Sequence, residues 1–146
     1  MPRVVIDYDP SPHDGGRQFS ADTSDLVYFL SWAFSQRYGA NHELSIAALI
    51  LRGEFKIDLS PLLTFADRNV EDPADAEALE RAWQDPEPLA EACRSVAAAL
   101  AAGERRLAGL QDDYPGLRSN IEELAQIAAW AEERGVRIRV TYVLEE

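Results

Sequence analysis

The stretch from Asp22 to Gly39 constrains the fold most, because it predicts a helix that is apolar on nearly all sides. Such a helix lies inside a domain or under another protein. Tyr28 and Trp32 share a second face of this helix and belong to residue types that anchor interfaces, so they are candidate partner-binding residues, with core packing as the alternative. The first, broader face carries Leu26, Phe29, Leu30, Ala33 and Phe34.

Composition limits the classes of function. The chain has 146 residues, of which 47% are hydrophobic, and this predicts one folded domain over residues 1–146. Its net charge of −12 repels phosphate backbones, which disfavours nucleic-acid binding and favours a basic protein partner or a cation. Because the chain shows no secretory apolar region and no membrane-spanning run, we expect a cytoplasmic protein without a membrane partner.

Residues 3–8, 54–59 and 136–144 are predicted strands, and residues 54–59 alternate apolar and polar side chains as a half-buried strand does. Valines on both sides of the first segment predict a position inside the sheet. We therefore expect an α+β domain with a small, mainly antiparallel sheet made of these three strands and covered by several helices.

Capping signals place the helices. Residues 42–52 favour a helix, although residues 45–51 also fit a strand. The pairs Ser60-Pro61, Asp72-Pro73 and Asp85-Pro86 each combine a cap residue with a proline that opens a helix.

An apolar seam with alternating steps of four and three predicts one long helix, through Leu89, Cys93, Val96, Leu100, Gly103, Leu107 and Leu110. After a turn over residues 112–116, Ser119 and Glu122 have the spacing of a capping box and open another helix. The short connection predicts an antiparallel helical hairpin, whose seam closes within one chain or between the chains of a homodimer.

The end of the first strand concentrates candidate metal ligands, namely Asp7, Asp9, His13 and Asp14. Carboxylates suit a divalent cation such as magnesium, and histidine extends the choice to manganese or zinc. His42 joins this site only if the fold brings it to His13. The alternative is a solvated loop in which the aspartates cap turns.

Arg137 and Arg139 lie two residues apart on the last strand and therefore on one side of the sheet. They are candidate anion-binding residues, because guanidinium groups form forked hydrogen bonds with anions. Pairing with Glu54 and Asp58 of a neighbouring strand is the favoured alternative. Cys93, the only cysteine, lies among alanines, which favours a small buried residue over a nucleophile.

No nucleophile elbow, phosphate-binding loop or metal motif of established spacing is present in the sequence. The sequence therefore favours a non-enzymatic interaction module of inhibitor or immunity type that binds a basic partner. A small metal-dependent hydrolase built on Asp7, Asp9, His13 and Asp14 is the alternative, and a divalent metal is the one cofactor that this alternative requires.

Overall fold

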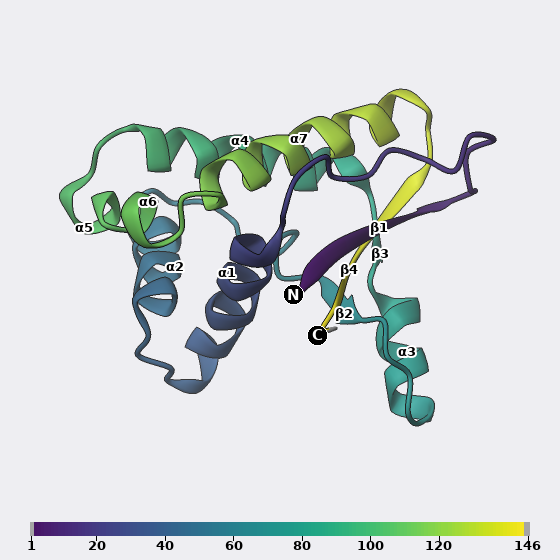
Figure 1. Cartoon of the computed structure of the whole chain (residues 1–146), viewed down its shortest axis with the longest axis horizontal. Helices are drawn as coiled ribbons and strands as arrows, with labels where there is room; N and C mark the ends of the chain where they lie inside the picture. The colour runs from purple at the N-terminus through teal and green to yellow at the C-terminus, as the bar shows by residue number, and fades with distance from the viewer. Residues whose placement is uncertain (1, 145–146) are drawn as a thin grey trace.

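The computed structural model describes residues 2–144 and confirms the α+β fold, with a mixed four-stranded sheet beside helices (Figure 1). Strand β4, Arg137–Val143, forms the centre of the sheet. On one side it pairs antiparallel with β1, Arg3–Asp9. On the other side it pairs in parallel with β2, Phe65–Asp67, and antiparallel with the short β3, Trp83–Gln84.

Strand β1 lies at the edge of the sheet, so the predicted interior position was wrong. Side chains from the following loop bond to its outer edge. The Ile6 N–H donates to Gln18 Oε1 over 2.9 Å, Gln18 Nε2 donates to the Ile6 carbonyl over 2.6 Å, and the Val4 N–H donates to Thr23 Oγ1 over 2.8 Å. Polar side chains thus provide hydrogen bonds that a neighbouring strand would otherwise make.

The predicted strand over residues 54–59 was also wrong. Ile57 and Leu59 are buried, as the alternation implied, but the segment pairs with no strand in the described part of the chain. Lys56 adopts a φ of 58°, and the Ile57 N–H donates to the Leu51 carbonyl over 3.2 Å. Residues 60–63 form turns rather than the helix predicted from Ser60-Pro61, and the strand β2 follows them.

The other predicted helices are present. Helix α1, Ser24–Ser35, continues into the 3-10 helix η1, Gln36–Tyr38, and ends at Gly39, whose φ is 90°. Residues 43–52 are helical, as favoured, within α2, Glu43–Gly53, and His42 is its N-cap. Helix α3, Pro73–Arg81, and helix α4, Pro86–Ala101, start after the predicted caps Asp72 and Asp85.

Helices α4 and α7, Leu117–Glu133, form the predicted antiparallel hairpin along one side of the molecule (Figure 1). The predicted single helix through Leu110 was wrong, because Gly103 adopts a φ of 80° and ends it. Two short helices follow instead: α5, Arg105–Ala108, and α6, Leu110–Asp113. Leu107 and Leu110 remain buried, so their seam positions predicted burial although the helix had ended.

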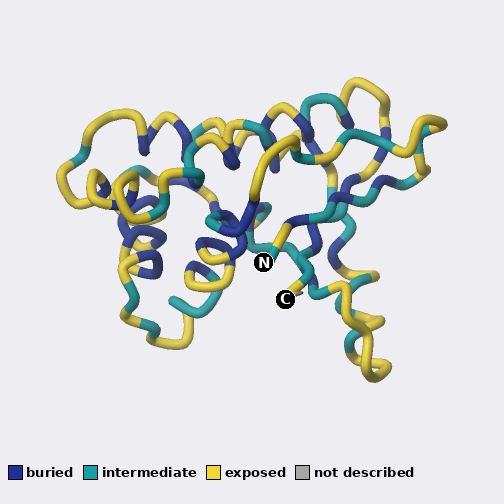
Figure 2. Tube along the Cα trace, in the orientation of Figure 1, coloured by how far each residue is buried: buried dark blue, intermediate teal, exposed yellow. Residues whose placement is uncertain are grey.

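The core lies between the hairpin, the α1–α2 pair and one face of the sheet. Val4, Ile6 and Tyr8 are buried on this face, and the Tyr8 ring meets the Trp130 ring of α7 edge-on at 5.2 Å between centroids. Helix α3 extends away from this core and contains no buried residue (Figure 2). Within residues 2–144, no helix has both the length and the apolarity needed to cross a bilayer.

Candidate functional site

Helices α1 and α2 pack side by side and bury their inner faces completely. Phe29, Leu30 and Leu44 are at most 2% exposed. The Ser45 hydroxyl donates to the Trp32 carbonyl over 2.7 Å and joins the two helices where they touch. Their outer sides are therefore presented on a fixed support.

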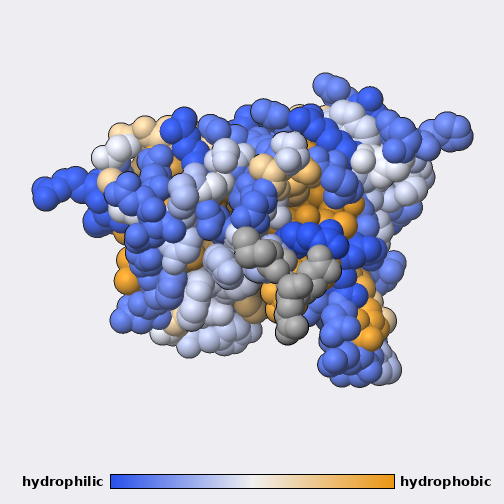
Figure 3. Space-filling model, in the orientation of Figure 1, coloured by the Kyte–Doolittle hydropathy of each residue, from blue (hydrophilic) through white to orange (hydrophobic). Residues whose placement is uncertain are grey.

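Large hydrophobic side chains gather on the outer sides of these two helices. Of the seven that are exposed among the described residues, five lie between residues 28 and 49. Tyr28 is 42% exposed and Trp32 38% on α1, while Ile46 is 44% and Leu49 50% exposed on α2. Hydrophilic groups cover most of the face drawn in Figure 3, but apolar surface is visible over the outer flank of α2.

His42 connects the two rows of apolar side chains. Its imidazole stacks on the Trp32 indole with 4.3 Å between centroids and 5° between planes. Its Nδ1 accepts a hydrogen bond from the Leu44 N–H over 3.1 Å, which caps α2. Positions 42, 46 and 49 follow helical spacing, so His42, Ile46 and Leu49 share one side of α2. We call Tyr28, Trp32, His42, Ile46 and Leu49 together the α1–α2 surface.

The predicted residues Tyr28 and Trp32 thus form the part of this surface that lies on α1, and the sequence analysis missed the three residues of α2 and its cap. His42 interrupts the apolar pattern of His42, Ile46 and Leu49, because a histidine is more readily interpreted as a metal ligand than as a stacking partner. The spacing of Ile46 and Leu49 on the side opposite to Ala47 and Leu51 was the signal that could have identified these two residues.

The carboxylates of the candidate metal site face arginines instead of one another. The register places Asp7 opposite Arg139 and Asp9 opposite Arg137. Asp7 Oδ2 accepts hydrogen bonds from Arg68 Nη1 over 2.8 Å and from Arg139 Nε over 3.0 Å, and Asp9 pairs with Arg137. Because guanidinium groups already neutralise both carboxylates, a cation would have to displace them.

His13 and Asp14 lie apart from these pairs in the loop that follows β1. They line a shallow cavity of about 520 Å³ together with Arg134 and Val136. This loop and the start of α2 lie at opposite sides of the molecule, so His13 and His42 do not meet (Figure 1). Within residues 2–144, no group of three or more histidines, cysteines, aspartates or glutamates has an arrangement that could hold a metal ion.

Arg137 and Arg139 are paired, but not with the acidic residues that the sequence analysis favoured. Glu54 instead pairs with Arg106 of α5, since residues 54–59 do not join the sheet. The Arg139 guanidinium also lies 4.4 Å from the Trp83 ring centroid and donates to the Leu79 carbonyl over 3.2 Å. An anion at these two arginines would have to displace Asp7 and Asp9.

Cys93 lies in the buried side of α4. Burial raises the pKa of its thiol to about 12, so the thiol stays protonated at neutral pH. A protonated, enclosed thiol is a poor nucleophile and packs as a small apolar side chain.

Comparisons of the chain with protein-family models, with curated proteins and with solved structures gave no match. Asp7, Asp9, Arg137 and Arg139 engage one another. Among the residues singled out from the sequence, Tyr28 and Trp32 are the large apolar ones that a partner can reach.

Proposed function

We propose that this protein is a cytoplasmic, non-enzymatic interaction module that binds a basic protein partner through the α1–α2 surface, as an inhibitor or immunity protein does. The single observation that carries the proposal is the concentration of exposed large hydrophobic side chains on two adjoining helices whose inner faces are fully buried.

The geometry of this surface favours binding over a purely structural role. Contiguous apolar patches larger than roughly a few hundred Å² are rare on monomeric proteins and mark recognition sites. Tryptophan and tyrosine are the residues that most often dominate the binding energy of interfaces. The stack on His42 restricts the Trp32 ring before any partner arrives, which lowers the entropy lost on binding.

Charge supports the choice of a basic partner. The net charge of −12 attracts positively charged proteins and accelerates their encounter. Part of this charge lies on α3, which extends from the core and carries Asp75, Glu77 and Glu80 next to the capping Asp72. A basic partner that docks on the α1–α2 surface is therefore steered by acidic groups elsewhere on the same molecule.

A matched pair of substitutions tests the proposal. Leu49→Glu places a charge in the α1–α2 surface, and Val70→Glu is its control, because Val70 is 48% exposed but lies next to α3. The wild-type protein is used to capture partners from a lysate of its source, and the captured protein is identified and titrated in purified form. We expect a basic protein whose Kd rises at least tenfold, roughly 1.4 kcal/mol, with Leu49→Glu and stays unchanged with Val70→Glu.

Two outcomes contradict the proposal. One is a partner that binds both variants equally well, because its docking site would then lie elsewhere. The other is a protein that light scattering finds to be a homodimer, with Leu49→Glu converting it to a monomer. In that case the α1–α2 surface serves self-association.

A further inference from the structure

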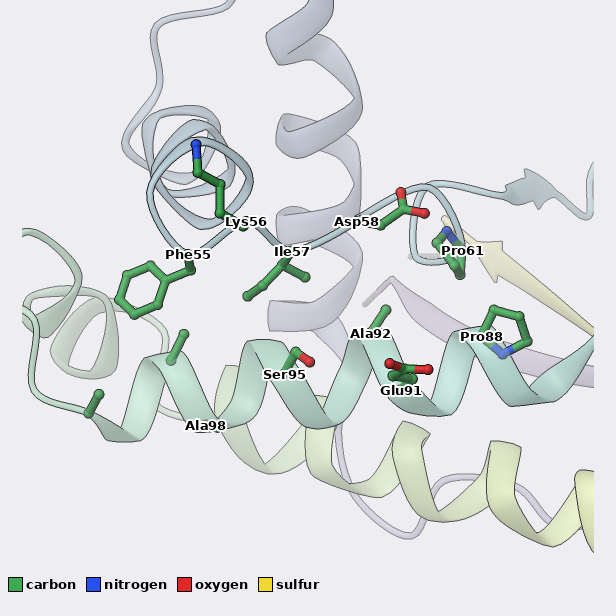
Figure 4. Close-up of a pocket in the computed structure, with 12 residues that line it drawn as sticks. Phe55, Lys56, Ile57, Asp58, Pro61, Pro88, Glu91, Ala92, Ser95 and Ala98 are labelled. Atoms are coloured by element: carbon green, nitrogen blue, oxygen red, sulfur yellow. The ribbon is translucent and has the colours of Figure 1, made fainter.

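A long groove runs between residues 55–61 and the outer side of α4 (Figure 4). Its volume is about 650 Å³, within the size range of binding sites for small molecules and peptides. Its lining extends from Pro88 in α4 to Ala102 at the C-cap of this helix, which corresponds to roughly 20 Å along a helix. An extended chain of about six residues has the same length.

The groove combines apolar walls with a floor of small residues. Phe55, Ile57, Pro61 and Pro88 supply the walls, and Ile57 points toward α4 (Figure 4). Ala92, Ser95 and Ala99 form the floor, where the absence of large side chains lets the backbone of a bound segment approach the helix. An extended segment points alternate side chains to opposite sides, so one row of its apolar side chains can lie against these walls.

Three charged residues line the groove, and two of them are acidic. Glu91 lies on α4, whereas Lys56 and Asp58 lie on the loop with their charged groups pointing away from α4, at the outer rim (Figure 4). Hydrogen bonds from Ser60 lower the pKa of Asp58, so this carboxylate is charged at neutral pH. Within residues 2–144, no arginine, lysine or histidine forms an ion pair with Glu91 or Asp58.

We infer that this groove binds an extended peptide segment of a protein partner, in which arginine or lysine alternates with apolar residues. The apolar side chains contact Phe55 and Ile57, and the basic ones reach Asp58 and Glu91. The choice of a basic protein as the source of the segment rests on the proposed function. The groove is a second contact for that partner, separate from the α1–α2 surface.

A titration with a defined peptide tests the inference. The probe is a fluorescein-labelled peptide that alternates arginine and leucine, and its matched control carries glutamate in place of arginine. We expect the arginine peptide to bind and the glutamate peptide not to bind. Amide shifts in a ¹⁵N spectrum should change at residues 55–61 and along the outer side of α4.

Charge-matched variants distinguish peptide binding in the groove from nonspecific electrostatic attraction to the acidic protein. Glu91→Gln removes one charge inside the groove, and Glu133→Gln removes one from the exposed end of α7. We expect Glu91→Gln to raise the peptide Kd about tenfold, as the loss of a charged hydrogen bond does. Glu133→Gln should leave it unchanged. Equal weakening by the two variants, or shifts concentrated on α3, would overturn the inference.

A steric variant distinguishes this inference from the proposed function. Ser95→Phe fills the floor of the groove, and Ala101→Phe places the same ring on an exposed position of α4 outside it. We expect Ser95→Phe, and not Ala101→Phe, to abolish peptide binding. If groove variants bind the captured partner normally while Leu49→Glu loses it, the groove inference is wrong and the proposed function stands. If only groove variants lose the partner, the α1–α2 surface is wrong and the groove stands.

Discussion

Strand β1 and residues 54–59 have the same sequence pattern and different structures. Both carry three large apolar residues at every second position: Val4, Ile6 and Tyr8 in the first, and Phe55, Ile57 and Leu59 in the second. Strand β1 pairs with β4 along its whole length. Residues 54–59 pair with no strand in the described part of the chain, although Ile57 and Leu59 are buried. Alternation therefore predicted which side chains are buried, and it did not predict which backbones pair.

The partners available to each backbone explain the difference. Seven residues of β4 run antiparallel to β1, and Gln18 bonds to the opposite edge. Residues 54–59 come immediately after α2, and the Ile57 N–H bonds back to the Leu51 carbonyl. This bond and the positive φ of Lys56 keep the segment against the end of the helix. The two segments therefore have different neighbours. Strand β1 faces arginines across the sheet, and residues 55–58 face a groove.

The largest effect should come from truncating one isoleucine in each segment. Ile6 is 2% exposed within the sheet core, whereas Ile57 is 8% exposed and borders the groove. Ile6→Ala leaves an enclosed cavity and should lower the free energy of unfolding by about 3 kcal/mol. Ile57→Ala widens a groove that water already enters, so it should cost about half as much. Urea unfolding followed by circular dichroism measures both, and equal losses would show that the two segments are buried alike.

The sequence predicted some local features and missed others. Asp72, Asp85 and Gly39 begin or end helices where the sequence analysis placed them. Ser60-Pro61 opens only turns, and α7 begins at Leu117, ahead of the predicted cap Ser119. The hydrogen bond between Gln18 and Ile6 joins positions twelve residues apart. The loop between them has no regular pattern, so periodicity could not predict this bond. Likewise, the partners of Arg137 and Arg139 follow from the strand register, which the sequence analysis assigned to the wrong pair of segments.

The candidate site was predictable to the extent that it depends on helix faces. Tyr28 and Trp32 were separated from the core face by helical spacing, and they are exposed. Whether exposed aromatic residues form one surface with α2 depends on how two helices pack, and the stack of His42 on Trp32 is a contact between helices. The groove exists because residues 54–59 pair with no strand in the described part of the chain. Their alternation of apolar and polar residues predicted the opposite.

Substituting Gln18 tests what holds the outer edge of β1. Gln18→Ala leaves the Ile6 N–H and carbonyl without their side-chain partner and should lower the free energy of unfolding by about 1–2 kcal/mol. Gln126→Ala is the control, because Gln126 accepts a single exposed hydrogen bond from Arg17, and it should change stability by less than about 0.5 kcal/mol. Amide exchange at Ile6 should also accelerate in the first variant. An unchanged exchange rate would mean that β4 alone holds the strand.

Substituting Lys56 gives effects of opposite sign for a strand and for the observed conformation. Valine favours strands but strongly disfavours a positive φ, so Lys56→Val should destabilise the protein by about 1 kcal/mol or more. Asparagine tolerates this region of φ, and Lys56→Asn should leave stability nearly unchanged. Both substitutions remove the same charge, which makes each the control of the other. A more stable valine variant, measured by thermal unfolding, would restore the strand that the alternation predicted.

The smallest effect concerns the ion pairs that fix the start of residues 54–59. Arg106 bonds to Glu54 and Glu104, and these bonds lower the pKa of both carboxyls, that of Glu104 from 4.5 to about 2. A carboxyl whose pKa is lower in the folded state stabilises the protein above its unfolded pKa and loses this contribution as the pH falls toward the folded value. The wild-type protein should therefore lose stability between pH 4.5 and pH 2 more steeply than Arg106→Gln.

The stability difference between the two proteins should be present at neutral pH and should vanish near pH 2. It should be small even at neutral pH, because these side chains are exposed and water and salt screen their attraction. Raising the salt concentration should reduce it further. Urea midpoints of both proteins across this pH range provide the measurement. Parallel pH profiles would mean that Arg106 contributes nothing to anchoring the segment, leaving the Ile57–Leu51 hydrogen bond and the burial of Ile57 and Leu59 to hold it in place.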